Sequence, residues 1–211
     1  MSVSELRKEY YQDSLDESDA NADPIAQFQA WFSDALTRDL PEPNAMTLAT
    51  ASASGHPSSR IVLLKDFDAS GFVFYTNYES RKGRELSENP FASLTFFYPT
   101  LERQIRVEGA VERVSAEESD AYFASRPIGS RLGAWASRQS CVVADRATFE
   151  ERLRVLEVRA QTEMIPRPPH WGGFRVIPET IEFWQGRQNR LHDRLRYCRR
   201  NGGWVVERLE P

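Results

Sequence analysis

The feature that most constrains the fold is a succession of short strand-like segments joined by turns that contain Gly or Asp. These segments are rich in β-branched and aromatic residues, and they follow one another closely along the chain. The pattern predicts an antiparallel meander and disfavours an alternating β-α-β chain. The predicted strands comprise residues 45–52, 59–65, 72–76, 92–98 and 101–114.

Helical segments flank these strands. Asp23 can cap a helix whose first turn contains Pro24, and apolar residues recur at helical spacing from Ile25 to Leu36. Mostly antiparallel strands with flanking helices indicate the α+β class and a small β-barrel, in one domain of residues 23–211. The other predicted elements are helices at 116–125 and 145–161 and strands at 173–176, 180–185, 195–199 and 204–208.

Charge is distributed unevenly along the 211 residues. Five acidic residues lie between Asp13 and Asp23 among few apolar ones, so residues 1–22 are predicted to form a mobile N-terminal arm. Arginines are instead concentrated near the C-terminus. The net charge of -4 argues against nucleic acid as a partner.

Several classes of protein are disfavoured. Residues 1–11 contain no apolar secretion signal, and no later apolar run reaches membrane-spanning length, so we expect a cytoplasmic protein without a membrane partner. Cys141 and Cys198 are predicted to be reduced thiols. The three histidines are not spaced for shared ligation, so no metal is expected.

The segment from Phe183 to Arg194 combines three arginines, a histidine and an indole around Gly186. Guanidinium groups suit phosphate and carboxylate, and Trp184 offers a flat apolar wall for a ring. The segment therefore predicts a site for an anionic or aromatic ligand. The alternative is a solvated basic strand end with Trp184 in the core.

A second candidate site lies at residues 76–84. Ser80 is a plausible helix cap, which places Arg81 and Lys82 in the first turn. Cations oppose the helix dipole there, so their presence favours a bound phosphate that also accepts the backbone N–H groups. The alternative is a loop whose long side chains reach water.

Two further segments carry cations near apolar residues. Arg60 and Lys65 bracket four apolar residues, as in a strand buried on both faces whose charged ends reach a site rim, although strand ends are often charged. Between residues 122 and 131 one helix ends and another begins. There Ser130 is a possible cap beside Arg126, and the pair predicts either a second phosphate site or only a turn.

Eight motifs follow one another from about residue 23 to the C-terminus. They are Arg60–Lys65, Phe74–Asn77, Ser80–Lys82, Glu102–Gly109, Ser125–Pro127, Trp171–Gly173, Glu182–Gly186 and Asn189–Arg194. Together these motifs closely resemble the pyridoxine 5'-phosphate oxidase family. The resemblance implies an FMN-binding split barrel and a homodimer with FMN at the subunit interface. It further implies oxidation of pyridoxine 5'-phosphate or pyridoxamine 5'-phosphate to pyridoxal 5'-phosphate, with O2 as acceptor and hydrogen peroxide as product.

The resemblance also implies roles for individual residues. The Arg81 and Lys82 pair would hold the FMN phosphate, and Arg190 and His192 would be the catalytic residues beside the pyridine ring. The other implied FMN ligands, some of them from the second subunit, are Arg60, Ile61, Val62, Leu63, Leu64, Lys65, Tyr75, Thr76, Gln104, Gln139, Ser140, Trp184 and Arg194. The implied substrate-binding residues are Lys65, Tyr122, Arg126, Ser130, Arg190, Leu191 and His192, with Arg7 and Tyr10 of the arm folding over the substrate.

Other functions stay open at this point. A related flavin oxidase acting on phenazine precursors would keep the FMN residues and change those for the substrate. A carrier of flavin or pyridoxal phosphate, or an RNA-binding module, would use the same basic groups without catalysis. His192 lies two residues from both Arg190 and Arg194, so its protonated form is expected to be disfavoured.

Overall fold

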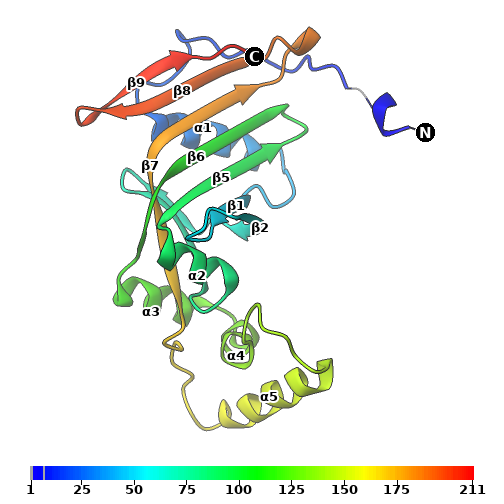
Figure 1. The fold of residues 1–211 in the computed structure, drawn as a ribbon, viewed down its shortest axis with the longest axis vertical. Helices are drawn as coiled ribbons and strands as arrows, with labels where there is room; N and C mark the ends of the chain where they lie inside the picture. Colours follow the sequence, from blue (N-terminus) through cyan, green and yellow to red (C-terminus); the bar gives the residue numbers. More distant parts are fainter. Residues whose placement is uncertain (1, 7) are drawn as a thin grey trace.

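A strongly curved antiparallel sheet dominates the computed structural model, which describes residues 2–6 and 8–211 (Figure 1). The strand order is β2-β1-β5-β6-β7-β4-β3, and β8 and β9 extend the sheet from β7. This arrangement confirms the predicted α+β class. The strands are β1 (Ala45–Ala51), β2 (Pro57–Leu63), β3 (Asp66–Asp68), β4 (Gly71–Asn77), β5 (Phe91–Tyr98), β6 (Arg103–Arg113), β7 (Trp171–Gln185), β8 (Asp193–Arg200) and β9 (Gly203–Arg208).

The helices lie on the concave side of the sheet and beyond one of its ends. In Figure 1, α3, α4 and α5 lie at the lower end, whereas β8 and β9 lie at the upper end beside the N-terminal arm. The predicted helices at 116–125 and 145–161 correspond to α3 and α5. The helices are α1 (Pro24–Thr37), α2 (Arg81–Glu88), α3 (Ala116–Ser125), α4 (Ile128–Ala136) and α5 (Arg146–Arg159), with 3-10 turns η1 (Val3–Glu5) and η2 (Gln188–Arg190).

Strand β7 links the two ends of the molecule. The sequence predicts separate strands at 173–176 and 180–185, but these are two halves of one strand that pairs with β6 from Phe174 to Gln185. The first half also pairs with β4, and the second half pairs with β8. A register shift between Glu108 and Gly109 bends the strand near Pro178 without breaking it. Gly109 is required there, since a Cβ atom would lie 1.9 Å from the Ile177 carbonyl oxygen.

Helix α1 fills the concave side of the sheet. Asp23 caps the helix and Pro24 begins it, as predicted. Its buried residues include Phe28 and Trp31, and the Phe28 ring contacts Phe72 and Phe96 with centroids 4.9 and 5.1 Å apart. Burial of such aromatic side chains contributes roughly 2 to 3 kcal/mol each, so this helix and the sheet stabilise one shared core.

Strand β2 corrects one expectation about residues 60–65. The four apolar residues between Arg60 and Lys65 were expected to form a strand buried on both faces, but β2 is an edge strand of this sheet and ends at Leu63. Ile61 is consequently 64% exposed, and only Leu64 is buried. An edge strand has one neighbour rather than two, so its outward side chains stay uncovered within this chain.

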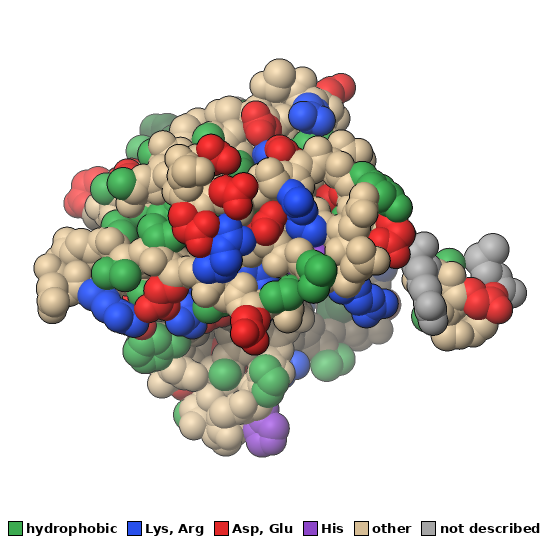
Figure 2. Space-filling model, turned by 90° about the horizontal axis from the view of Figure 1, so that it is seen from above, with side chains coloured by type: hydrophobic (Ala, Val, Ile, Leu, Met, Phe, Trp, Pro, Cys, Tyr) green, Lys and Arg blue, Asp and Glu red, His purple; other side chains and the backbone are tan. Residues whose placement is uncertain are grey.

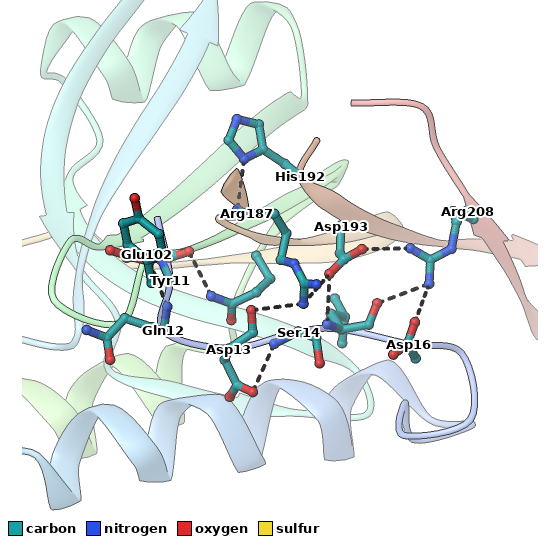
Figure 3. Close-up of polar contacts among 12 residues, drawn as sticks. Tyr11, Gln12, Asp13, Ser14, Asp16, Glu102, Arg187, His192, Asp193 and Arg208 are labelled. Atoms are coloured by element: carbon teal, nitrogen blue, oxygen red, sulfur yellow. Dashed lines mark hydrogen bonds and ion pairs between the residues drawn. The ribbon is translucent and has the colours of Figure 1, made fainter. Parts of the chain in front are cut away.

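The N-terminal arm lies against the barrel in this structure rather than free of it. Leu15 is only 4% exposed and belongs to the hydrophobic core. Acidic arm residues pair with barrel arginines, Asp13 with Arg103 and Glu17 with Arg208. Figure 3 shows Asp16 of the arm beside the same Arg208. Figure 2, which looks onto this end, shows basic and acidic side chains lying side by side. The acidic composition of the arm predicted mobility. Sequence alone does not show that arginines of the barrel pair with its carboxylates.

Two further observations concern residues 2–6 and 8–211. No helix within them has the length and apolar character needed to cross a bilayer, and they contain no group of three potential metal ligands. Cys141 is exposed and Cys198 is half-buried, and both are free thiols.

Candidate functional site

The first pocket is built around the N-terminus of α2. Ser80 caps the helix by accepting the N–H of Gly83, so Arg81 and Lys82 occupy the first turn, as predicted. The Lys82 ammonium lies 2.8 Å from the side-chain oxygen of Gln139 and 3.2 Å from the Thr76 hydroxyl. Burial, together with the nearby positive charge of Arg60, lowers the pKa of Lys82 to about 8. Because burial and Arg60 disfavour the charged form of Lys82, an anion bound beside it would stabilise that form.

A buried carboxylate organises the cations of this pocket. Glu85 is 5% exposed and pairs with Arg81 at 2.8 Å and with Arg60 at 3.3 Å. Burial opposes its ionisation, but hydrogen bonds from Ser58, Thr50, Arg81 and Arg60 outweigh burial and lower the pKa of Glu85 to about 2. The carboxylate therefore stays ionised and fixes two guanidinium groups at the pocket edge. Sequence reasoning missed Glu85, although its spacing of four residues from Arg81 on a helix was a usable signal.

The pocket itself has a volume of about 490 Å³ and continues from α2 to α3 and α4. Its wall is aromatic, with the rings of Tyr75 and Tyr122 stacked 4.0 Å apart and Trp171 parallel to both. Its lining includes many of the residues predicted for FMN and substrate, namely Ile61, Val62, Leu63, Lys65, Tyr75, Thr76, Lys82, Tyr122, Arg126, Ser130 and Gln139.

Arg126 supplies the second cationic position of this pocket. Its guanidinium carbon lies 4.6 Å from the centre of the Trp171 ring, and its Nη1 atom is buried without a hydrogen-bond partner among the described residues. Ser130 lines the same pocket. The sequence suggested Ser130 as a possible cap of α4, but in the structure it does not cap this helix. Pro127 occupies the N-cap position, so Ser130 lies inside the first turn of α4.

A second pocket of about 550 Å³ lies at the opposite end of β7. Trp184, Arg190 and His192 line it together with Tyr10 of the arm. The indole and imidazole rings are 4.6 Å apart between centroids. The alternative in which Trp184 is a core residue is wrong, because its side chain is only half-buried and faces this pocket.

Three residues predicted for the flavin site form a row across neighbouring strands. Gln104 on β6 is paired with Trp184 on β7, which is paired with Arg194 on β8. The next row contains Glu182, whose carboxylate accepts hydrogen bonds from Arg194 at 2.9 and 3.2 Å and also pairs with Arg106. Arg194 also donates to the carbonyl oxygen of Glu210 at 2.8 Å, so three hydrogen bonds hold it in a fixed orientation.

His192 is held in a defined tautomer. Its Nδ1 atom accepts the backbone N–H of Arg187 at 3.1 Å, which leaves the proton of the neutral ring on Nε2. Burial lowers the pKa of His192, and the charge of Arg190 lowers it further, while Asp193 opposes the shift. The expected direction is thus confirmed, although burial is the larger cause and Arg194 does not contribute. The ring can donate a hydrogen bond from Nε2 near neutral pH.

The two pockets lie far apart within one chain. Trp171 lines the first and Trp184 lines the second, at opposite ends of β7. Twelve residues lie between them, so the distance is roughly 40 Å along an extended strand. The structure thus divides the predicted site residues into two groups, and a single copy does not bring them together. Ser140 and Leu191 are exposed, the first beside Gln139 and the second in the loop before β8.

The arm contributes Tyr10 to the second pocket. Its ring meets those of Trp184 and His192 edge to face, each at 5.7 Å. Arg7, which was predicted to act with Tyr10, lies outside the described residues. Sequence reasoning also missed Glu102, whose carboxylate accepts the backbone N–H groups of Tyr11 and Gln12. It lies within the motif 102–109, but only the folded arm shows what it contacts.

Comparisons with known proteins find similar sequences over the whole chain. The family model described as pyridoxamine 5'-phosphate oxidase matches residues 32–162. The model of the pyridoxine 5'-phosphate oxidase C-terminal dimerisation region matches residues 171–211. Proteins named pyridoxine/pyridoxamine 5'-phosphate oxidase are similar over the full length. One from Bordetella petrii is 61% identical over 213 residues, with complete coverage of both chains, and one from Acaryochloris marina is 58% identical over 210 residues, covering 100% and 96%.

Two solved structures share the fold. PhzG from Burkholderia lata 383, in complex with tetrahydrophenazine-1-carboxylic acid, has a TM-score of 0.88 and 33% identity, covering 94% of this chain and 98% of its own. An FMN binding protein related to pyridoxamine 5'-phosphate oxidase, from Nostoc punctiforme, has a TM-score of 0.71 and 20% identity, covering 87% and 97%. These neighbours confirm the predicted split-barrel fold.

Proposed function

The chain belongs to the pyridoxamine 5'-phosphate oxidase family, and from this premise we propose that it oxidises pyridoxine 5'-phosphate and pyridoxamine 5'-phosphate to pyridoxal 5'-phosphate. One observation carries the proposal. The first pocket contains two separate cationic positions, Lys82 and Arg126, and neither has a carboxylate partner in the described part of the chain. Two such positions suit two phosphates, one on the cofactor and one on the substrate.

The residues at the start of α2 fit the phosphate of FMN, the cofactor that the family indicates. Arg81 and Lys82 project from the first turn, where free backbone N–H groups also favour an anion. The lowered pKa of Lys82 is consistent with a cation that lacks its counter-ion. Arg60, held by Glu85, adds a third positive group at the same edge. The residues present therefore fit a flavin phosphate.

The substrate phosphate is assigned to the other cationic position. Arg126 lies over Trp171 with Nη1 buried and free to donate, and Tyr122 and Ser130 line the same pocket. Lys65 lies on the pocket edge beyond the end of β2. A guanidinium held against an indole is preorganised, so little side-chain freedom is lost when it binds a phosphate.

A homodimer would unite the two pockets. One copy separates them by the length of β7, and the region from residue 171 to residue 211 matches a family dimerisation region. We propose that Gln104, Trp184 and Arg194 of one subunit complete the flavin site of the other. Arg190 and His192 would then lie beside the substrate ring held by the partner's Arg126.

With its phosphate held by Arg81 and Lys82, FMN would supply the redox chemistry, namely acceptance of a hydride from the substrate C4' atom and reoxidation by O2 to give hydrogen peroxide. The protein's part is to position the two rings and to manage charge. Arg190 carries a permanent positive charge toward the substrate oxygen substituent. His192, neutral and protonated on Nε2, offers a hydrogen bond without adding a second charge. Trp184 supplies the apolar surface that excludes water from one side of the pocket.

The structural similarity to PhzG favours a second candidate substrate. That protein was solved with a tricyclic carboxylic acid, and it is 33% identical to this chain, of which it covers 94%. Such a ligand has a carboxylate but no phosphate. The cations at Arg126 and Lys65 would then bind the carboxylate, and the wider ring would extend toward the second pocket of the partner subunit.

Anaerobic reduction tests the proposal directly. The purified protein is mixed with pyridoxine 5'-phosphate without oxygen, the flavin absorbance is followed, and air is then admitted. Bleaching, then recovery of colour with formation of peroxide and pyridoxal 5'-phosphate, is the expected result. The flavin of the wild-type protein should bleach slowly with pyridoxine, which lacks the phosphate. The flavin of the Arg126→Ala variant should bleach slowly with pyridoxine 5'-phosphate. Bleaching only by a reduced phenazine carboxylate would overturn the proposal in favour of the second candidate.

A further inference from the structure

Glu102 is a buried carboxylate with no role in the barrel itself. The residue is 2% exposed and occupies the turn between β5 and β6. One carboxylate oxygen accepts the N–H groups of Tyr11 at 2.7 Å and Gln12 at 3.0 Å, and the other lies 3.2 Å from the Lys8 ammonium. Every partner of this carboxylate within residues 2–6 and 8–211 thus belongs to the N-terminal arm.

The backbone around Glu102 is arranged for this contact. Glu102 has a φ of +55°, in the left-handed region that side chains rarely adopt. Its carbonyl oxygen accepts the N–H of Gly186 at 2.7 Å. Gly186 in turn leaves room for the arm, because a Cβ atom there would lie 2.7 Å from Cγ of Tyr10. A buried charge and a rarely adopted backbone conformation both cost free energy, so their occurrence in one residue indicates a specific role.

The contact determines where Tyr10 lies. Tyr11 and Gln12 are bound through their backbone, so the preceding residue is directed into the second pocket, where its ring meets Trp184 and His192. Burial opposes ionisation of Glu102, but the N–H groups of Gln12 and Tyr11 and the Lys8 ammonium lower its pKa. The carboxylate is therefore charged at neutral pH, and charge-assisted hydrogen bonds hold the arm.

We propose that Glu102 is a positioning residue that docks the N-terminal arm through the Tyr11 and Gln12 N–H groups and thereby places Tyr10 in the wall of the second pocket. The docking stands on the contacts of this chain alone. Its consequence for turnover rests on the proposed function, since only then does the second pocket receive the substrate ring.

Glu102→Gly is the variant of choice. It removes the carboxylate and suits the positive φ, so the turn keeps its conformation. Glu42→Gly is the matched control, because Glu42 also has a positive φ of 45° but is exposed, and its side chain has no hydrogen bond or ion pair with the described residues. Hydrogen exchange of the Tyr11 and Gln12 amides should become about tenfold faster in Glu102→Gly and stay unchanged in Glu42→Gly. Unchanged exchange in both variants would overturn the proposal.

Kinetics separate positioning from a general loss of structure. In Glu102→Gly the KM for pyridoxine 5'-phosphate should rise about tenfold while kcat changes less and FMN affinity stays the same. Glu102→Gln, which keeps one acceptor oxygen, should restore part of the exchange protection and of the KM. Loss of FMN together with activity would show a structural role and would contradict the proposal. If wild type does not turn over this substrate, the proposed function fails, but the exchange experiment still decides the docking.

Discussion

The Tyr10 ring meets the Trp184 indole edge to face, with centroids 5.7 Å apart and planes at 89°. The two residues belong to the N-terminal arm and to the end of β7, which are remote in sequence. Edge-to-face pairs of this kind contribute about 0.5 to 1.5 kcal/mol beyond burial. The contact links the position of the arm to the shape of the second pocket, and several of the expectations below depend on it.

Gly186→Ala should displace the arm. The added methyl group would lie 2.7 Å from Cγ and 2.9 Å from Cβ of Tyr10, so the tyrosine must move away from Trp184. We expect limited proteolysis of the arm to become about tenfold faster, with the barrel intact. Gly203→Ala is the control, since its methyl group would meet nothing closer than 3.9 Å. Equal proteolysis of both variants would show that Gly186 does not accommodate the arm.

Replacing both Arg81 and Lys82 by Ala should weaken FMN binding. Charge-assisted hydrogen bonds contribute about 1.5 to 3 kcal/mol each, so the double variant should lose at least about 100-fold in affinity. Fluorescence titration of the apoprotein with FMN measures this loss. Arg84→Ala removes an exposed cation from the same helix and should leave the affinity within about twofold. An unchanged affinity in the double variant would refute the phosphate assignment.

Arg190→Ala should reduce turnover and leave FMN bound. Its charge lowers the pKa of His192, so removing it should raise that pKa toward the usual value, although burial will still keep it low. NMR titration of the His192 ring protons in both proteins checks the direction. In wild type, kcat/KM should fall with protonation of His192 only below about pH 6.5. A His192 pKa that does not move in the variant would show that Arg190 lies too far away to matter.

Glu85→Gln should destabilise the apoprotein in a pH-dependent manner. The folded-state pKa of about 2 lies below the ordinary value of 4.5, so ionised Glu85 contributes stability above pH 4.5 that is lost as the pH falls toward 2. The shift corresponds to roughly 3 kcal/mol. Urea unfolding of wild type and variant should therefore differ at pH 7 and converge near pH 2. A difference that is independent of pH would mean that the carboxylate charge is not responsible.

Local sequence patterns predicted most of the secondary structure. The cap residues Asp23 and Ser80 begin α1 and α2 as expected, because capping depends only on neighbouring backbone groups. The strands of the meander were also predicted from local sequence patterns. The exceptions required distant contacts. The burial of residues 60–65 depends on β2 being an edge strand, and the continuity of β7 depends on its pairing with β6 from Phe174 to Gln185.

The site was predicted in parts. Arg81, Lys82 and Arg126 were recognised from helix boundaries, and Lys82 and Arg126 line one pocket in the structure. The carboxylates that hold these and other groups, Glu85 and Glu102, were not recognised. A carboxylate in a polar motif resembles any surface residue until its partners are known, and the partners of Glu102 lie about 90 residues away.

The sequence by itself determined the order of strands and helices, the caps, the basic segments and the family, because each depends on residues close together or on a pattern along the chain. Only the tertiary structure decided that β7 separates the predicted site residues into two pockets, that the acidic arm lies against Arg103 and Arg208, and that Glu102 faces the arm. These relationships join residues far apart in sequence. They arise from the curvature of the sheet and from charge pairing across it, which no local pattern encodes.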